Sequence, residues 1–330
     1  MMGKTKLSDV ARAAGVSPMT VSRVLNGRGG ASPDTCERIR QIADELNYRP
    51  NALARGLKSD KSRIVGVLVP DISNPFFPEI IRGIESVAMQ NGYNLLLCNV
   101  DESAKREIDL MQILESQRVD GIVWCSARLP EQPLIKALQA YKAAVLVNRS
   151  VAPAIAGSIM IDYRTGAADA ARHLWQTDRR RIAILAGPTT SRGAAERLEG
   201  VKTAFEALGA EPVAVVHCNP DVAGGAAASK GILTSSPDID GIICYNDLNA
   251  VGALQTCEEL GLSVPHDVSI IGFDGISLGE LVRPKLSTLH VDKYSIGQLS
   301  MRMLLDRIDG KFIQHSIVIR PELTLRGSTA

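Results

Sequence analysis

Aromatic residues are scarce in this 330-residue chain, at 4% of the sequence. Long apolar runs are absent: none approaches the about 18 residues that a membrane-spanning helix needs, and the N-terminus lacks a signal-peptide core. We therefore expect a cytoplasmic protein with no membrane partner. Hydrophobic residues still make up 45% and charged residues 22%, which is typical of a globular protein, and the length suggests two or three domains.

Closely spaced cysteines and metal-binding motifs are also missing. The six cysteines are scattered without a Cys-x-x-Cys pair, so we expect free thiols that pack as small apolar side chains. The five histidines are dispersed, with no His-Glu-x-x-His pattern, and no metal site is predicted. A loop between Gly187 and Gly193 resembles a phosphate loop only loosely, because no Lys-Ser or Lys-Thr follows it.

Two aspartates are the strongest candidates for acid–base chemistry. Asp247 and Asp274 each follow an apolar segment that is typical of a strand. Carboxylates in such places can also hydrogen-bond sugar hydroxyls. With no other catalytic group in view, we expect no catalytic residue, no cofactor and no enzyme activity.

The first 50 or so residues carry the clearest sequence pattern. One helical face is predicted by apolar residues at Leu7, Val10, Ala11 and Ala14. Gly15 breaks this pattern, and Ser17 with Pro18 is typical of a new helix start. The second helix has its own apolar stripe: Val21, Val24 and Leu25. Two short helices around a tight turn form either an ordinary packed pair or a helix-turn-helix that enters the DNA major groove.

The rest of this region favours DNA. The exposed side of the second helix would carry short polar groups and an arginine: Thr20, Ser22, Arg23 and Asn26. A third helix is predicted from Ser32 and Pro33, with a buried stripe of Ile39, Ile42, Ala43 and Leu46. Residues 1–63 hold twelve Lys and Arg against six Asp and Glu, whereas the other residues are net acidic. A compact basic end is the electrostatic pattern of a nucleic-acid-binding domain.

A short bridge follows at 48–58. Asn51 can start a helix of about two turns that contains Gly56, and helices this short are marginal in water. The segment is either a plain linker or a hinge helix that folds on DNA, with Leu57 wedged into the minor groove.

From residue 64 onward, short apolar runs alternate with amphipathic segments. The predicted strands are 64–69, 93–98, 121–124, 144–147, 158–161, 181–185, 213–217, 242–244 and 269–273. The predicted helices are 77–90, 104–117, 133–140, 163–175, 191–208, 223–234, 247–260 and 294–308. This order is typical of two α/β lobes with parallel sheets, which bind ligands at the carboxyl ends of their strands. The last helix and the strands after it are expected to cross back between the lobes.

Several motifs together resemble the lactose/galactose-repressor (LacI/GalR) family over essentially the whole chain. They include Thr20-Val-Ser-Arg-Val-Leu-Asn26, Tyr48-Arg-Pro-Asn51, Gly241-Ile-Ile-Cys-Tyr-Asn-Asp247, Asp267-Val-Ser-Ile-Ile-Gly-Phe-Asp274 and Leu286-Ser-Thr-Leu289. The resemblance implies a helix-turn-helix domain at 1–50, a hinge at 51–61 and a periplasmic-binding-protein-like effector domain at 62–330. The first lobe would be about 62–161 with 291–320, and the second about 162–290 with 321–330.

The resemblance also implies the DNA contacts. Pro18, Met19 and Arg23 match base-facing positions, of which Arg23 can pair with guanine. Phosphate-contacting positions are matched by Ser17, Thr20, Ser22 and Asn26. Leu57 matches the leucine that wedges into the central base step, with Ala54 beside it.

For the effector cleft, the resemblance points to eight residues: Asn74, Phe76, Phe77, Asn148, Arg149, Arg197, Asn246 and Asp274. Alternatively, Phe76 and Phe77 cap the core of the first lobe, and Arg197 with Asp274 forms an ion pair between the lobes. Many sugar-binding members carry Asp before Arg149, whereas this chain has Asn148, and Val222 stands where several carry an aromatic platform. The lost carboxylate suggests an anionic sugar derivative as an effector, beside a neutral sugar.

We therefore expect a homodimeric repressor of double-stranded operator DNA that a small sugar or sugar acid releases. A corepressor-dependent regulator is the alternative. A sugar-binding protein without DNA function would need a signal peptide and no helix-turn-helix. No heptad segment is seen near Ala330, so a dimer is preferred over a tail-linked tetramer.

Overall fold

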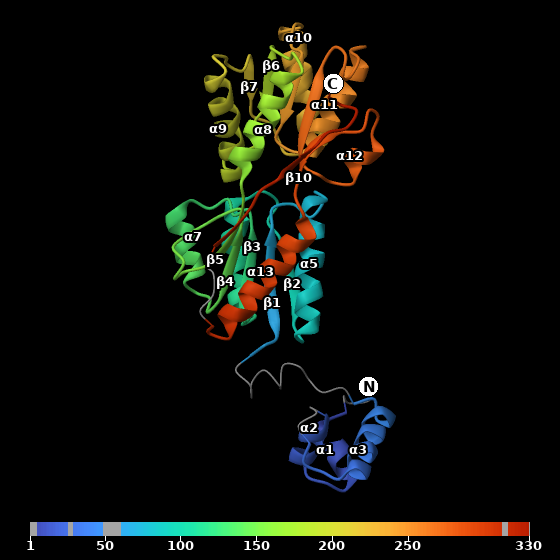
Figure 1. Ribbon diagram of the computed structural model, residues 1–330. Helices are drawn as coiled ribbons and strands as arrows, with labels where there is room; N and C mark the ends of the chain where they lie inside the picture. The colour runs from blue at the N-terminus through green and yellow to red at the C-terminus, as the bar shows by residue number, and fades with distance from the viewer. Residues whose placement is uncertain (1–4, 26–28, 49–60, 312–315, 330) are drawn as a thin grey trace. The chain divides into compact units, whose positions relative to one another are not determined.

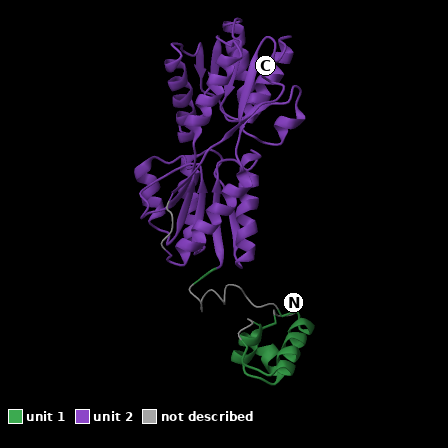
Figure 2. Cartoon of the chain, viewed as in Figure 1, with its two compact units in different colours: residues 1–62 green, residues 63–330 purple. Residues whose placement is uncertain are grey.

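The computed structural model describes residues 5–25, 29–48, 61–311 and 316–329. The chain divides into two compact units, 1–62 and 63–330 (Figure 2). The predicted hinge helix with Ala54 and Leu57, and also Asn26, lie outside the described residues. Within the described residues, no helix has the length and apolar character needed to cross a membrane.

The described part of the first unit contains three helices: α1 (Leu7–Ala14), α2 (Pro18–Leu25) and α3 (Pro33–Glu45). Gly15 ends α1 in the left-handed conformation, with a φ of 64°, so the predicted break is confirmed. Ser17 Oγ accepts the Thr20 N–H at 3.1 Å, and Ser32 Oγ accepts the Thr35 N–H at 3.3 Å. Both predicted helix starts are therefore built as serine caps.

The apolar stripes of these helices meet in one small core. Its fully buried members come from all three helices: Val10, Ala11, Ala14, Val21, Val24, Ile39 and Ala43. Leu46 was expected in the buried stripe, and that prediction is wrong. Leu46 lies one residue beyond α3 as its C-cap and is 38% exposed, because the helical periodicity ends before it.

The second unit holds two six-stranded sheets. The first has the order β11-β5-β4-β3-β1-β2 and is parallel throughout. Its strands are β1 (Ile64–Val69), β2 (Asn94–Asn99), β3 (Gly121–Cys125), β4 (Ala144–Val147), β5 (Gly157–Ile161) and β11 (Ser316–Ile319). The second has the order β12-β10-β9-β8-β6-β7. Its strands are β6 (Ile182–Leu185), β7 (Ala214–Val216), β8 (Gly241–Cys244), β9 (Ser269–Asp274), β10 (Ser287–His290) and β12 (Glu322–Thr324).

Helices cover both faces of each sheet, so each sheet forms one lobe of the unit (Figure 1). In the first lobe, α5 (Phe76–Gln90) and α13 (Lys293–Ile308) share the core on one face, while α6 (Ala104–Ser116) and α7 (Glu131–Leu138) share that on the other. In the second lobe, the pairs are α8 (Tyr163–Gln176) with α9 (Arg192–Ala207), and α10 (Val222–Ser235) with α11 (Asp247–Glu259). A short α12 (Leu278–Leu281) follows β9.

Alternation along β1 shows why the strands are almost wholly apolar. Val65, Val67 and Val69 join the core under α5 and α13, whereas Leu68 joins the opposite core under α6 and α7. Both faces of a parallel strand in this architecture are buried, so both need apolar residues.

The chain passes between the lobes after β5, after β10 and after β11, as expected for its last segments. One expectation needs correction: the second sheet is not wholly parallel, because β12 pairs antiparallel with β10. The reason is geometric. β11 runs parallel to β5 toward the second lobe, and β12 follows it after only two residues. The chain therefore enters the second sheet at the carboxyl ends of its other strands and runs in the opposite direction to them.

Candidate nucleic-acid interface and ligand pocket

The outer face of α2 presents the residues expected to meet DNA. Pro18, Met19 and Arg23 are exposed, and Met19 is 59% exposed despite being apolar. Ser17 and Thr20 share a hydrogen bond of 2.9 Å between their hydroxyls, which fixes both side chains at the start of the helix. These side chains therefore lie at the surface of a helix that is anchored in the small core.

Arg23 is the strongest hydrogen-bond donor on this face, and a glycine gives it room. Its guanidinium lies against Gly30, where an added Cβ atom would come within 3.2 Å of the Arg23 Cζ. Gly30 also has a φ of 102°, a conformation that residues with side chains rarely adopt. The sequence pattern alone does not reveal this contact.

A polar pocket lies at the carboxyl ends of strands from both lobes. From the first lobe it is lined by residues that follow β3 and β4: Ser126, Ala127, Arg128 and Asn148. From the second lobe it is lined by the start of α8, the start of α9 and the end of β8: Tyr163, Ser191, Arg192, Gly193, Arg197 and Tyr245. Two of the eight predicted effector residues, Asn148 and Arg197, therefore line the same pocket.

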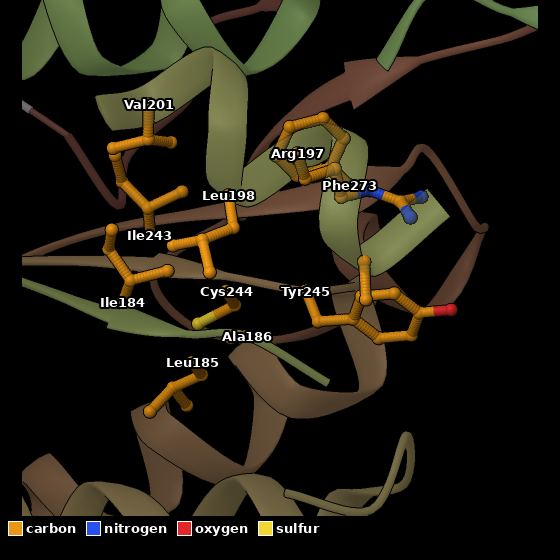
Figure 3. A pocket seen from close by; sticks show the side chains of 11 residues that line it. Ile184, Leu185, Ala186, Arg197, Leu198, Val201, Ile243, Cys244, Tyr245 and Phe273 are labelled. Atoms are coloured by element: carbon orange, nitrogen blue, oxygen red, sulfur yellow. The ribbon is translucent and has the colours of Figure 1, made fainter. Parts of the chain in front are cut away.

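Arg197 is buried and enclosed by aromatic rings. Its Cζ atom lies 3.6 Å from the ring centroid of Tyr163, 4.7 Å from that of Tyr245 and 4.8 Å from that of Phe273. A second, apolar pocket lies beside it. Figure 3 shows the guanidinium of Arg197 and the hydroxyl of Tyr245 pointing away from the aliphatic side chains there. Burial opposes the charge, but the tyrosines and Asp274 outweigh it and hold the pKa of Arg197 above its usual range.

Asp274 is the carboxylate partner of Arg197. Arg197 Nη2 donates to Asp274 Oδ1 at 3.2 Å, and both residues are buried. Burial raises the pKa of Asp274 to about 6, although the positive charges of Arg197 and Lys293 act in the other direction. Asp274 also has a φ of 103°, so its backbone is strained where it ends β9. The alternative of an ion pair between lobes is wrong, because α9 and β9 both belong to the second lobe.

Asn148 connects the lobes. Its Nδ2 donates to Tyr163 Oη at 2.9 Å, from the end of β4 to the start of α8. Its Oδ1 is buried and has no hydrogen-bond partner among the described residues. With a φ of 58°, Asn148 holds a left-handed conformation that Asn tolerates better than most residues.

Arg128 and Glu107 hold the wall of the pocket and were not predicted. Arg128 donates to both carboxylate oxygens of Glu102, at 2.6 and 3.0 Å. Glu107 is fully buried and accepts the backbone N–H groups of Arg128 and Leu129, at 2.8 and 2.9 Å. Burial raises the pKa of Glu107, against these hydrogen bonds. The only sequence signal for Arg128 is its place shortly after an apolar strand.

Arg149 lies beside the pocket rather than in its lining. Its Nη2 donates to the Leu129 carbonyl at 3.0 Å, while its buried Nε has no partner among the described residues. Burial lowers the pKa of Arg149, and the charge of Arg192 lowers it further. The positive charges of these two arginines therefore repel each other.

The remaining predicted effector residues make their contacts inside the two lobes. Phe76 and Phe77 stack edge to face, with centroids 5.1 Å apart, inside the core of the first lobe. Asn74 Oδ1 accepts the Phe76 N–H at 3.0 Å. Asn246 uses both ends of its amide internally, toward the Asn249 N–H at 2.8 Å and the Pro220 carbonyl at 2.9 Å. In this arrangement these four side chains do not line the pocket.

The described residues offer little for covalent chemistry. A Gly-x-Ser-x-Gly pentapeptide is present at 275–279, but no histidine hydrogen-bonds Ser277 in the part of the chain that is described. That part also contains no cluster of three His, Cys, Asp or Glu side chains suited to a metal ion. All six cysteines are free thiols, four of them buried.

Both units match known families of bacterial proteins. Residues 6–51 match the bacterial regulatory proteins of the lacI family. Residues 62–325 match the periplasmic binding proteins and sugar binding domain of the LacI family.

Similar proteins include several regulators. The ribose operon repressor of Halalkalibacterium halodurans is 37% identical, over 93% of this chain and 91% of that protein. The transcriptional repressor CytR of Escherichia coli K12 is 33% identical, over 98% and 96%. Among solved structures, the lac repressor dimer bound to operator and the anti-inducer ONPF has a TM-score of 0.91 at 28% identity and covers 99% of both chains.

These matches, together with the exposed face of α2 and the pocket between two α/β lobes, agree with each other along the chain. Regulators of this kind are DNA-binding proteins rather than enzymes. This chain belongs to the LacI family of bacterial regulatory proteins and is a DNA-binding transcriptional regulator.

Proposed function

We propose that this protein is a cytoplasmic repressor that binds a near-palindromic operator as a homodimer and carries out no chemistry itself. The observation that carries the proposal is the face of α2, with exposed Met19 and Arg23 above a closed three-helix core. The similar lac repressor was solved as a dimer on its operator, which supports the same assembly here.

In the proposed complex, α2 lies in the major groove. Pro18 and Met19 contact apolar base edges such as the thymine methyl group, and Arg23 donates to guanine. Ser17, Thr20, Ser22 and Asn26 contact phosphates, which set the register of the helix. Ala54 and Leu57 act in the minor groove, where an apolar wedge bends the duplex.

The proposed signal is a small, hydroxylated effector in the pocket between the lobes. Asn148 and Arg197 contact it directly, with Arg149 beside them and Asp274 holding Arg197 in place. Asn74, Phe76, Phe77 and Asn246 stabilise the lobes that carry the pocket rather than line it. A LacI-family regulator of Enterococcus faecium with a TM-score of 0.74 was solved with bound ribose, which supports a sugar-like ligand. Binding favours one arrangement of the lobes and thereby releases DNA.

The direct test of the DNA-binding face is Arg23→Ala. The variant should lose about 1–3 kcal/mol of binding free energy for the selected operator and discriminate less at the base that Arg23 contacts. Fluorescence anisotropy with a duplex selected from a random pool measures both effects.

Arg12→Ala is the matched control, because it removes one positive charge from the same unit at an 82% exposed position. It should weaken binding to all duplexes alike and only slightly. Equal losses for the two variants on every duplex would contradict the recognition role of Arg23.

A further inference from the structure

The first turn of α9 ends at the pocket with two free backbone donors. Ser191 caps this 16-residue helix, and its oxygens accept the N–H groups of Ala194 and Ala195. The N–H groups of Arg192 and Gly193 have no acceptor among the described residues, and both residues line the pocket. Such free amides carry the positive end of the helix dipole and favour an anion.

Gly193 lets a positive side chain lie close to the same turn. An added Cβ atom at Gly193 would come within 3.1 Å of Arg197 Nη1 and of the Tyr163 ring. The buried Nε of Arg197 has no hydrogen-bond partner in the described part of the chain. A cation with an unused donor therefore lies beside the two free amides.

The nearby carboxylates do not accept from these free amides, because each already pairs with an arginine. Glu102 is bound by Arg128, Glu196 by Arg192, and Asp274 by Arg197. Among the described side chains that line the pocket, Asn148 contributes a buried acceptor, its Oδ1, that has no hydrogen-bond partner. An incoming anion would thus meet donors on the second lobe, and a hydroxyl beside it would find an acceptor on the first.

We propose that this end of the pocket binds the carboxylate or phosphate group of a hydroxylated acid, such as a sugar acid or sugar phosphate. The amides of Arg192 and Gly193 and the guanidinium of Arg197 hold the anion, and Asn148 Oδ1 accepts from an adjacent hydroxyl. This inference rests on the proposed effector role of the pocket and narrows its ligand to an anion.

The test compares two substitutions at one exposed position. Arg192→Ala removes the guanidinium and keeps the backbone N–H, whereas Arg192→Pro removes both. Proline suits the first position of a helix, and the φ of −84° and ψ of 118° at Ser191 suit a residue before proline. Binding of inorganic phosphate to the full chain is measured by calorimetry at constant ionic strength.

The proline variant should bind phosphate at least about tenfold more weakly than the alanine variant, because it lacks a donor to a charged group. Asn148→Asp, which adds a carboxylate to the pocket, should weaken phosphate binding by more than about tenfold. Arg172→Ala changes an arginine on α8 that pairs with Asp169 outside the pocket, and should keep the wild-type affinity. Equal phosphate affinity in all four variants would overturn the proposed anion site.

A second arm identifies the source of the anion. Glucose, gluconate and glucose 6-phosphate are titrated into the full chain bound to its selected duplex. Tighter binding of gluconate or glucose 6-phosphate than of glucose supports the inference and tells carboxylate from phosphate. Duplex release by glucose alone would overturn the proposed anion site but leave the proposed effector role intact. If no duplex can be selected by the full chain, the proposed DNA-binding function itself would be contradicted.

Discussion

At the scale of single residues, the second lobe buries two carboxylates close to each other. Asp247 is fully buried, and it accepts the Thr288 hydroxyl at 2.6 Å and the Ile276 N–H at 2.8 Å. Burial raises the pKa of Asp247 to about 8, and the negative charge of Asp274 adds to this effect. Asp274 itself has a pKa of about 6 because of its own burial. Protons on these groups therefore stabilise the folded chain.

The pH dependence of stability follows from these directions. An unfolded aspartate has a pKa near ~3.9, so between pH ~4 and 8 the folded chain binds more protons here than the unfolded chain. The free energy of unfolding contributed by Asp247 is present at low pH and is lost as the pH rises through 8. Relative to wild type, the free energy of unfolding of Asp247→Asn should rise by up to about 1.4 kcal/mol per pH unit between pH 6 and 8. Chemical denaturation at several pH values measures this difference.

Asp178→Asn is the control, because the side chain of Asp178 is 92% exposed. Its pH profile should run parallel to that of the wild type. A pH profile of Asp247→Asn that also runs parallel to that of the wild type between pH 6 and 8 would contradict the raised pKa of Asp247.

Some residue roles were predictable and others were not. Ser17, Ser32 and Gly15 act locally, within about four residues of their partners, so sequence spacing identified them. The roles of Glu107 and Tyr163 depend on segments that meet only in the folded chain. Periodicity also could not show that the amide of Asn246 is used internally.

At the scale of elements, paired helices approach each other through glycines. An added Cβ atom at Gly83 in α5 would lie 2.1 Å from the Tyr294 carbonyl oxygen of α13. The α8–α9 pair has the same arrangement, with Gly200 at 2.1 Å from the Arg164 carbonyl oxygen. These distances leave no room for a side chain, so the backbones themselves set how closely the helices pack.

Gly83→Ala should therefore destabilise the second unit by about 1–3 kcal/mol or more, because the added methyl group must push two backbones apart. Gly231→Ala in α10 is the matched control, since nothing lies within 4 Å of its added Cβ atom. It should stabilise the helix by about 0.5–1 kcal/mol. Thermal and urea unfolding report both values, and the same sign for the two substitutions would contradict this packing.

The prediction of helices and strands from sequence succeeded where a periodic apolar pattern extends over many residues. The predicted 77–90 and 294–308 helices match α5 and α13 to within one residue at either end. Strand β12 has only three residues, and its antiparallel direction follows from the crossing between lobes, which no local pattern encodes.

At the scale of the whole molecule, the second unit joins its lobes through a buried lysine. Lys293, at the start of α13, is 2% exposed. Its Nζ donates to the carbonyl oxygens of Asp274, Gly275 and Val291, at 2.8, 2.9 and 3.1 Å. It also lies 3.8 Å from Glu79 Oε2 on α5. The strained turn after β9, which positions Asp274 against Arg197, is thus tied to helices of the first lobe. The effector that we propose at Arg197 would therefore act on both lobes.

The central claim is that occupancy of the pocket controls DNA binding. The most direct measurement is the affinity of the full chain for its selected duplex, with and without a saturating anionic sugar that binds the pocket. We predict a near-palindromic duplex whose affinity falls by about 5–150-fold when the ligand is added. A ligand that binds the pocket while the duplex affinity stays unchanged would contradict the account.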